Sequence, residues 1–269
     1  MSRLLETIAS GTDIYDLAQP LAAETPHSPN HPPFRMSLMR RHGDMVREDG
    51  SSSANELLVT GGHTGTHVDA LAHVSYEGRL HGGVYAKEAQ RGGRFSTLGV
   101  DALEPMVCRG VLLDVAGLHG VDVLPGGYGI TEEDFEAASE KVAVEVRPGD
   151  VALVRSGWAR NFGDAEAFLG HETGVPGPTE GAARWLAEKG VRATGGETIA
   201  YEQIKPTVAH RLLPVHRLLL VERGIHIIEV MNLTELAADW VYEFAFVLAP
   251  LNITGGTGSP VRPLAVVER

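Results

Sequence analysis

Three histidines and one carboxylate lie within eleven residues of this chain. They are His63, His67, Asp69 and His73, in the run Gly62-His63-Thr64-Gly65-Thr66-His67-Val68-Asp69-Ala70-Leu71-Ala72-His73. Imidazole and carboxylate groups together suit zinc or a similar divalent first-row ion. A single histidine is more often a surface or core residue than a ligand, but this density favours a metal. The run therefore predicts a metal-centred active site.

A regular element cannot bring these side chains to one ion. In a straight strand, at about 3.3 Å per residue, positions 63 and 69 would lie roughly 20 Å apart. In a helix, His63 and His67 would share a face, but Asp69 would point elsewhere. The chain must therefore bend, and Gly65 permits a bend. We expect His63, His67 and Asp69 to bind the ion and His73 to lie nearby, free for proton transfer.

The composition is that of an ordinary globular protein. The chain has 269 residues, of which 43% are hydrophobic and 22% charged, with a net charge of −12. Such a charge argues against nucleic-acid or anionic-membrane partners, which require basic patches. A single cysteine, Cys108, cannot form an internal disulfide, and the N-terminus has no secretory signature, so we expect a cytoplasmic protein. No stretch is long and apolar enough to span a bilayer.

Mixed strands and helices predict an α/β fold: a single domain over residues 1–269, with a central mixed sheet flanked by helices. Helices are predicted from a capping start at Thr131 to Val142, after Thr179 over Glu180–Lys189, and from Pro214 to Arg223. Two segments, Thr25–Phe34 and Gly163–Pro178, are predicted to be loops that border a site. Short apolar runs predict strands at Leu57–Thr60, Gly110–Val115, Val151–Arg155, Val191–Thr194, Ile225–Val230, Phe244–Leu248 and Val261–Val267.

The histidine run resembles the signature of the metal-dependent cyclase family, whose members include kynurenine formamidase-like and isatin hydrolase-like enzymes. Further blocks resemble the same family: Asp16–Leu21, Val215–Leu220 with Gly224–Leu233, and Pro250–Pro263. The resemblance implies a swivelling β/β/α-like fold. It also implies a homodimer or higher homo-oligomer acting on a small molecule.

By this resemblance His63, His67 and Asp69 are metal ligands, and His73 is the catalytic acid/base. His216 and Glu229 become candidate ligands, either for a second ion or for completing the first. Zinc and manganese both accept histidine and carboxylate, so neither the metal nor the number of ions follows from the sequence. The implied reaction is hydrolysis of an amide C–N bond in a cyclic amide or an N-acyl arylamine.

Two departures from the family pattern bear on the substrate. Leu71 stands where the family often has proline, and Ser28 stands where formamidase-type members carry a tryptophan. Ser28 argues against formylkynurenine as the substrate, whereas the run Asp69–His73 and the length of the chain are closer to the isatin hydrolase branch. Three other hypotheses stay open: an N-formylkynurenine formamidase, a metal-dependent lyase or cyclase, and a non-catalytic metal- or ligand-binding protein.

Four other expectations concern single residues. Loop histidines such as His31 are expected to be solvated surface residues. Trp158 and Tyr201 are expected to pack in the core more readily than to line a site. Glu197 is expected either to orient a ligand or to lie at a surface turn.

Overall fold

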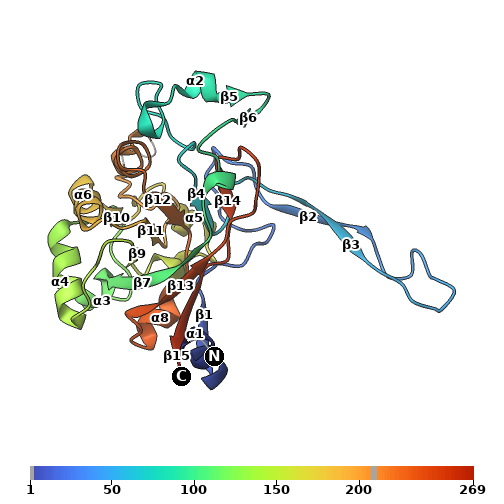
Figure 1. Ribbon diagram of the computed structural model, residues 1–269, viewed down its shortest axis with the longest axis horizontal. Coiled ribbons are helices and arrows are strands. Elements are labelled where there is room, and N and C mark those ends of the chain that lie inside the picture. Colours follow the sequence, from blue (N-terminus) through green and yellow to red (C-terminus); the bar gives the residue numbers. More distant parts are fainter. Residues whose placement is uncertain (1–2, 207–210) are drawn as a thin grey trace.

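A nine-stranded mixed sheet organises the chain in the computed structural model, which describes residues 3–206 and 211–269 (Figure 1). The strand order is β1-β15-β13-β7-β9-β11-β12-β4-β14. In chain order these strands are β1 (Thr12–Asp16), β4 (His67–Asp69), β7 (Met106–Asp114), β9 (Val151–Arg155), β11 (Ala193–Gly196), β12 (His226–Glu229), β13 (Glu243–Leu248), β14 (Gly258–Pro260) and β15 (Leu264–Glu268).

The four central strands β7, β9, β11 and β12 are parallel, and the outer ones pair antiparallel. Parallel neighbours need crossover connections, and the helices supply them. The main crossover helices are α4 (Glu132–Val142), α6 (Glu180–Lys189) and α7 (Pro214–His216), which continues as a π-helix, η5 (Arg217–Arg223). The shorter helices are α1 (Arg3–Ser10), α2 (Ala86–Ala89), α3 (Val115–Leu118), α5 (Ala165–Leu169) and α8 (Thr234–Ala238), with 3-10 turns η1 (His81–Gly83), η2 (Val100–Ala102) and η3 (Trp158–Asn161).

Side chains of the sheet divide between two apolar cores. In β9, Ala152 and Val154 pack with the helices α4, α6 and η5, whereas Val151 and Leu153 pack on the opposite face. This alternation follows from the two-residue period of a strand. Because both faces are covered, β9 reads as a continuous apolar run, as expected for a buried parallel strand.

The helix ends follow the predicted signals. Thr131 and Asp134 form a reciprocal capping box at the start of α4, and the Thr179 hydroxyl accepts the backbone N–H of Ala182 at the start of α6. Gly190 and Gly224 end their helices in the left-handed conformation. The α/β architecture with a central mixed sheet is thus confirmed.

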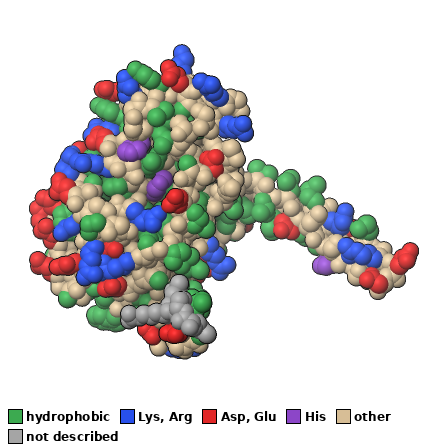
Figure 2. All heavy atoms as spheres, in the orientation of Figure 1, with side chains coloured by type: hydrophobic (Ala, Val, Ile, Leu, Met, Phe, Trp, Pro, Cys, Tyr) green, Lys and Arg blue, Asp and Glu red, His purple; other side chains and the backbone are tan. Residues whose placement is uncertain are grey.

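One sequence expectation was wrong, and a second is confirmed at an unexpected place. The predicted loop Gly163–Pro178 contains α5 and a short strand, β10 (Gly177–Pro178), which pairs with β8 (Gly129–Ile130). The predicted strand Leu57–Thr60 does form, as β3 (Asn55–Val59), but outside the central sheet. Among the described residues it pairs only with β2 (Arg35–Arg40), and the resulting hairpin, which we call the arm, projects from the body (Figures 1 and 2).

The remaining hairpin is small and joins β5 (Gln90–Arg91) to β6 (Arg94–Phe95). Over the described ranges, no helix combines the length and the apolar character that crossing a bilayer requires.

Candidate metal centre

Strand β4 places two of the predicted ligands. His67 and Asp69 alternate with Val68, so their side chains leave one face of the sheet while Val68 enters the core. The register with β12 sets Glu229 directly opposite His67. Cross-strand partners in an antiparallel pair share a face, so Glu229 joins the same cluster. The fold therefore brings Glu229 to His67 across 162 residues of sequence through strand pairing alone.

The loop before β4 turns His63 back toward the strand. Gly65 has a φ of +67°, a backbone conformation that favours glycine. On the other side of β4, Gly258 pairs with Asp69, and a Cβ at Gly258 would lie 2.5 Å from the His63 ring. The bend predicted at Gly65 is present, and the side-chain-free Gly258 makes room for His63.

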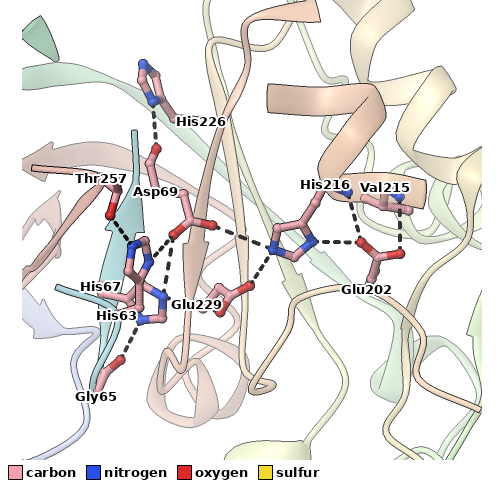
Figure 3. A network of polar contacts seen from close by, with 10 residues as sticks. All are labelled: His63, Gly65, His67, Asp69, Glu202, Val215, His216, His226, Glu229 and Thr257. Carbon is pink, nitrogen blue, oxygen red and sulfur yellow. Dashed lines mark hydrogen bonds and ion pairs between the residues drawn. The ribbon is translucent and has the colours of Figure 1, made fainter. Parts of the chain in front are cut away.

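His216 enters from the first turn of α7. Its backbone N–H donates to Oε1 of Glu202 at 2.9 Å, and its Nδ1 lies 2.7 Å from the same oxygen. The backbone N–H of Val215 donates to the other oxygen, Oε2. The other ring nitrogen of His216, Nε2, then faces Glu229 Oε1 at 3.1 Å and Asp69 Oδ2 at 3.6 Å (Figure 3). Sequence reasoning assigned no role to Glu202, although this buried carboxylate orients His216.

The other imidazoles are also held by definite partners. Nδ1 of His67 lies 2.8 Å from the Gly65 carbonyl, which leaves Nε2 toward Glu229 Oε2 at 3.3 Å and Asp69 Oδ1 at 3.6 Å. Nδ1 of His63 lies 2.8 Å from Asp69 Oδ1, and its Nε2 lies 3.0 Å from the Thr257 hydroxyl. Nδ1 of His226 lies 2.8 Å from the carbonyl oxygen of Asp69 (Figure 3).

The donor set fits a divalent ion. Candidate ligand atoms form two triads, His63–His67–Asp69 and Asp69–His216–Glu229, and within each triad they lie no more than 4.8 Å apart. All five residues are buried. Asp69 Oδ2 and Glu229 Oε1 nevertheless accept no hydrogen bond from the described residues. A buried carboxylate oxygen without a hydrogen bond is costly, and a cation would satisfy both. Because Asp69 belongs to both triads, the cluster suits one ion or two.

The histidines and carboxylates of the cluster shift one another's pKa values. Burial disfavours the charged forms of Asp69 and Glu229, but the adjacent histidines outweigh it and hold both pKa values below their usual range. Burial likewise opposes protonation of His67 and His216, yet neighbouring carboxylates outweigh it. Glu229 raises the pKa of His67. Glu202 and Glu229 together raise the pKa of His216. A cation would take the place of these protons, since ligands bind metals deprotonated.

His73 lies beside the cluster without joining either triad. Its ring stacks on His63 with the ring centroids 3.9 Å apart, and it lies 6.3 Å from the His216 ring. Burial lowers the pKa of His73 to about 4, so its imidazole is neutral near pH 7 and able to accept a proton.

A fifth histidine, His31, which the sequence analysis placed at the solvated surface, lies at the same site. The His31 ring stacks on His63 with centroids 5.0 Å apart and lies 6.1 Å from His73. It is half-buried, and burial lowers its pKa. Its backbone N–H donates to the Ser28 carbonyl, so the loop that contains Ser28 also delivers His31. The prediction that Thr25–Phe34 borders a site is consistent with this position; the surface assignment of His31 was wrong.

The side chains of Glu197 and Thr66 form hydrogen bonds with backbone groups rather than with candidate metal ligands. Glu197 is buried and accepts the backbone N–H groups of Ser156 and Gly157 at 2.8 and 2.6 Å, so it neither lies at a surface turn nor contacts a candidate ligand. The Thr66 hydroxyl donates to the Val230 carbonyl at 2.6 Å and accepts the backbone N–H of Gln19. It thereby ties the histidine loop to the chain just after Glu229.

The two aromatic side chains expected in the core are there. The Trp158 indole donates to the Phe168 carbonyl, and the Tyr201 hydroxyl bonds to Thr194 inside the sheet. Tyr201 and Val230 also adopt positive φ values of 55° and 57°. These conformations are unfavourable for non-glycine residues, and they occur directly beside Glu202 and Glu229.

The family model for Cyclase, described as "Putative cyclase", matches residues 15–203, more than two thirds of the chain. This chain belongs to the cyclase family. The match includes His63, His67, Asp69 and His73 but ends before His216 and Glu229. Those two residues of this cyclase-family chain are therefore placed at the site by the geometry described above.

Named relatives extend the comparison. An isatin hydrolase of Roseibium aggregatum is 27% identical over 100% of this chain and 97% of its own length. A kynurenine formamidase of Bacillus cereus is 26% identical over 92% of this chain and 94% of its own length. A crystal structure of a cyclase superimposes with a TM-score of 0.85 at 28% identity, covering 98% of this chain and 92% of the other.

Proposed function

We propose that this protein is a metal-dependent hydrolase that cleaves an amide C–N bond of a small molecule. The observation that carries the proposal is a buried set of three histidines and two carboxylates in which two carboxylate oxygens accept no hydrogen bond from the described residues. His63, His67, Asp69, His216 and Glu229 are the residues proposed to hold the ion. The relatives named above, an isatin hydrolase and a kynurenine formamidase, support the reaction class.

The chain's own residues divide the chemistry. A bound divalent ion would lower the pKa of a coordinated water from about 15.7 toward 7 and polarise the scissile carbonyl. His73, neutral and outside both triads, is proposed to accept the proton of the attacking water and pass it to the leaving nitrogen. Water thus adds across the bond: its oxygen goes to the carbonyl carbon, and one proton goes to nitrogen. Glu202 keeps His216 oriented, while the Gly65 turn keeps His63 and His67 together.

The proposed substrate class is a cyclic amide of the isatin type or an N-acyl arylamine. Ser28, where formamidase-type members have tryptophan, is buried and its hydroxyl accepts the backbone N–H of Asn30 at 3.3 Å. It therefore offers no aromatic surface on which a kynurenine ring could stack. Leu71 packs against the helix-side core, so its replacement of proline changes packing behind the site.

The proposal also covers the identity of the ion, the oligomeric state and the cellular compartment. The ion is manganese or zinc, since histidine and carboxylate ligands suit both, and one or two ions are bound. We propose a homo-oligomer, with a dimer as its simplest form. A single cysteine among 269 residues is compatible with a reducing, cytoplasmic setting.

Isatin ring opening, followed by absorbance, tests the proposal. Protein stripped of metal with a chelator should be inactive, and separate refilling with manganese or zinc should restore ring opening with one of them. A product heavier than the substrate by one water supports hydrolysis, whereas an unchanged total mass supports a lyase. Bound metal without turnover of isatin, other cyclic amides or N-formyl arylamines would support a binding protein instead.

A further inference from the structure

A cavity of about 550 Å³, which we call the hairpin cavity, lies beside the small hairpin β5–β6. Four glycines line it together with Gln90, Arg94, Phe95 and Thr257. The Thr257 hydroxyl lies 3.0 Å from Nε2 of His63, so one side chain touches both the cavity and a candidate metal ligand (Figure 3). A volume of this size is usual for sites that bind small molecules. The hairpin cavity therefore adjoins the metal centre.

Backbone contacts hold the two walls of the hairpin cavity together. The backbone N–H of Phe95 donates to the Gly255 carbonyl at 3.0 Å. Gly255 has a φ of +69°, and a Cβ on it would collide with the Phe95 backbone. The Gly255 N–H in turn donates to Oδ1 of Asp101 at 2.9 Å. The wall that carries Thr257 is thus fixed against β6.

The unengaged polar side chains of the hairpin cavity can donate hydrogen bonds. Among the described residues, neither the Arg94 guanidinium nor the Gln90 side-chain amide has a hydrogen bond or an ion pair. An adjoining cavity of about 620 Å³ shares Arg94 and adds Arg91. Asp101 is the one acidic residue that lines either cavity within the described ranges, and its Oδ1 already accepts a backbone N–H. The lining therefore carries more positive than negative charge.

This local charge is opposite to that of the whole chain. The chain has a net charge of −12, whereas residues 87–94 contain three basic residues and one acidic residue. Figure 2 shows Lys and Arg side chains at the top of the body, where Figure 1 places β5 and β6. A guanidinium matches the two oxygens of a carboxylate, and a positive patch attracts anions that the acidic surface repels. Because the half-buried Phe95 adds an aromatic surface, the hairpin cavity suits an aryl carboxylate.

The proposed reaction generates this kind of group. When water hydrolyses an amide, the C–N bond breaks, the water oxygen goes to the carbonyl carbon, and one proton goes to nitrogen. The new carboxylic acid then releases its own proton at neutral pH. In a cyclic amide fused to an aromatic ring, the carboxylate and the arylamine stay in one molecule. A neutral substrate thus becomes an anion beside a chain that is acidic overall.

We propose that the hairpin cavity binds the carboxylate of the ring-opened product, with Arg94 as its main contact. This inference rests on the proposed function and deepens it by giving the product a site of its own. Thr257, which contacts His63, places that site next to the proposed ion. An anion released there meets the donors of Arg94 and Gln90 and the ring of Phe95.

Calorimetric titration of the metal-loaded protein with 2-aminobenzoate tests the inference. This aryl carboxylate carries the two functional groups of a ring-opened product, and 2-aminobenzamide is its uncharged counterpart. The wild type should bind the carboxylate at least tenfold more tightly than the amide. Arg94→Gln should raise the dissociation constant of the carboxylate roughly 10- to 100-fold, as for the loss of a hydrogen bond to a charged group. The matched control Arg223→Gln removes an exposed positive charge outside both cavities and should stay within twofold of wild type.

Several outcomes would overturn the proposal. They are no binding of 2-aminobenzoate to the wild type, equal affinity for the amide, an unchanged dissociation constant in Arg94→Gln, and an equal loss in Arg223→Gln. Because Arg94 is exposed, its substitution should not disturb folding. The titration is repeated with metal-stripped protein, where the effect of Arg94→Gln should persist; its disappearance would mean that the carboxylate binds at the ion alone. No turnover is measured, so these outcomes are independent of whether the chain hydrolyses amides.

Discussion

Nδ1 of His216 lies 2.7 Å from Oε1 of Glu202, on the side of the ring away from Asp69 and Glu229 (Figure 3). The same carboxylate accepts the backbone N–H groups of Val215 and His216. A carboxylate at one imidazole nitrogen fixes the tautomer and aims the other nitrogen at the ion. Glu202 thereby couples the start of α7 to the metal centre without belonging to either triad.

Replacing Glu202 with glutamine should weaken metal binding. All three partners of this carboxylate can donate hydrogen bonds, so the glutamine NH₂ group would oppose at least one of them, and its neutral amide oxygen would hold His216 Nδ1 less strongly than a carboxylate does. We expect the dissociation constant for manganese or zinc to rise about 10- to 100-fold, as for other lost carboxylate–histidine partners. Titration against a competing chelator measures it. An affinity within twofold of wild type would contradict the positioning role, and the exposed Glu180→Gln serves as the matched control.

His67 and His73 should respond differently to alanine. His67 belongs to a triad and faces both carboxylates, so His67→Ala should lose bound metal and activity together. His73 lies outside both triads, so His73→Ala should retain the metal while turnover falls by roughly 10²- to 10⁴-fold. Metal content by elemental analysis, measured beside turnover, separates the two cases. Loss of metal from His73→Ala would show that His73 is a ligand.

How far the sequence predicted the site depends on how local each contact is. His63, His67, Asp69 and His73 could be grouped because they are contiguous and Gly65 offered the bend. Glu229 comes to His67 through the register of β12 with β4, which no local pattern encodes, and His216 likewise required the family resemblance. Glu202 and His31 were missed because their roles consist of contacts with residues distant in sequence.

The fold was predicted best where burial dictates the pattern. Continuous apolar runs identified β7, β9, β12 and β13, and capping residues identified α4 and α6. The arm shows the limit of this reasoning. Leu57 and Leu58 look like a core strand in the sequence, yet they lie on an exposed hairpin. An apolar strand on an exposed hairpin and one buried in the central sheet have the same residue pattern.

His31 should affect substrate binding more than metal binding. Its ring stacks on His63 from the loop side but belongs to neither triad. His31→Ala should therefore leave metal content unchanged and raise KM several-fold, while His31→Phe, which retains a stacking ring, should recover most of the loss. Steady-state kinetics on the substrate found by the isatin assay provide the measurement. A fall in metal content for both variants would instead make His31 a support for the ligand loop.

Glu197→Gln should destabilise the fold without affecting metal content. Ser156 and Gly157 both donate to Oε2 of Glu197, while the Leu233 backbone N–H approaches Oε1 at 3.4 Å. A glutamine can keep the first two partners, but its NH₂ group would then face the Leu233 N–H, at an expected cost of about 1–3 kcal/mol in unfolding free energy.

Burial raises the pKa of Glu197 above its ordinary 4.5, so the native state binds this proton more tightly than the unfolded state. The resulting stability is full below pH 4.5 and is lost as the pH rises through the raised pKa, because the stability slope follows the difference in bound protons. Glutamine does not titrate, so the advantage of wild type over Glu197→Gln should shrink as the pH rises above 4.5. Urea unfolding of metal-loaded protein at several pH values measures this difference, and an advantage that grows with pH would contradict the assigned direction of the shift.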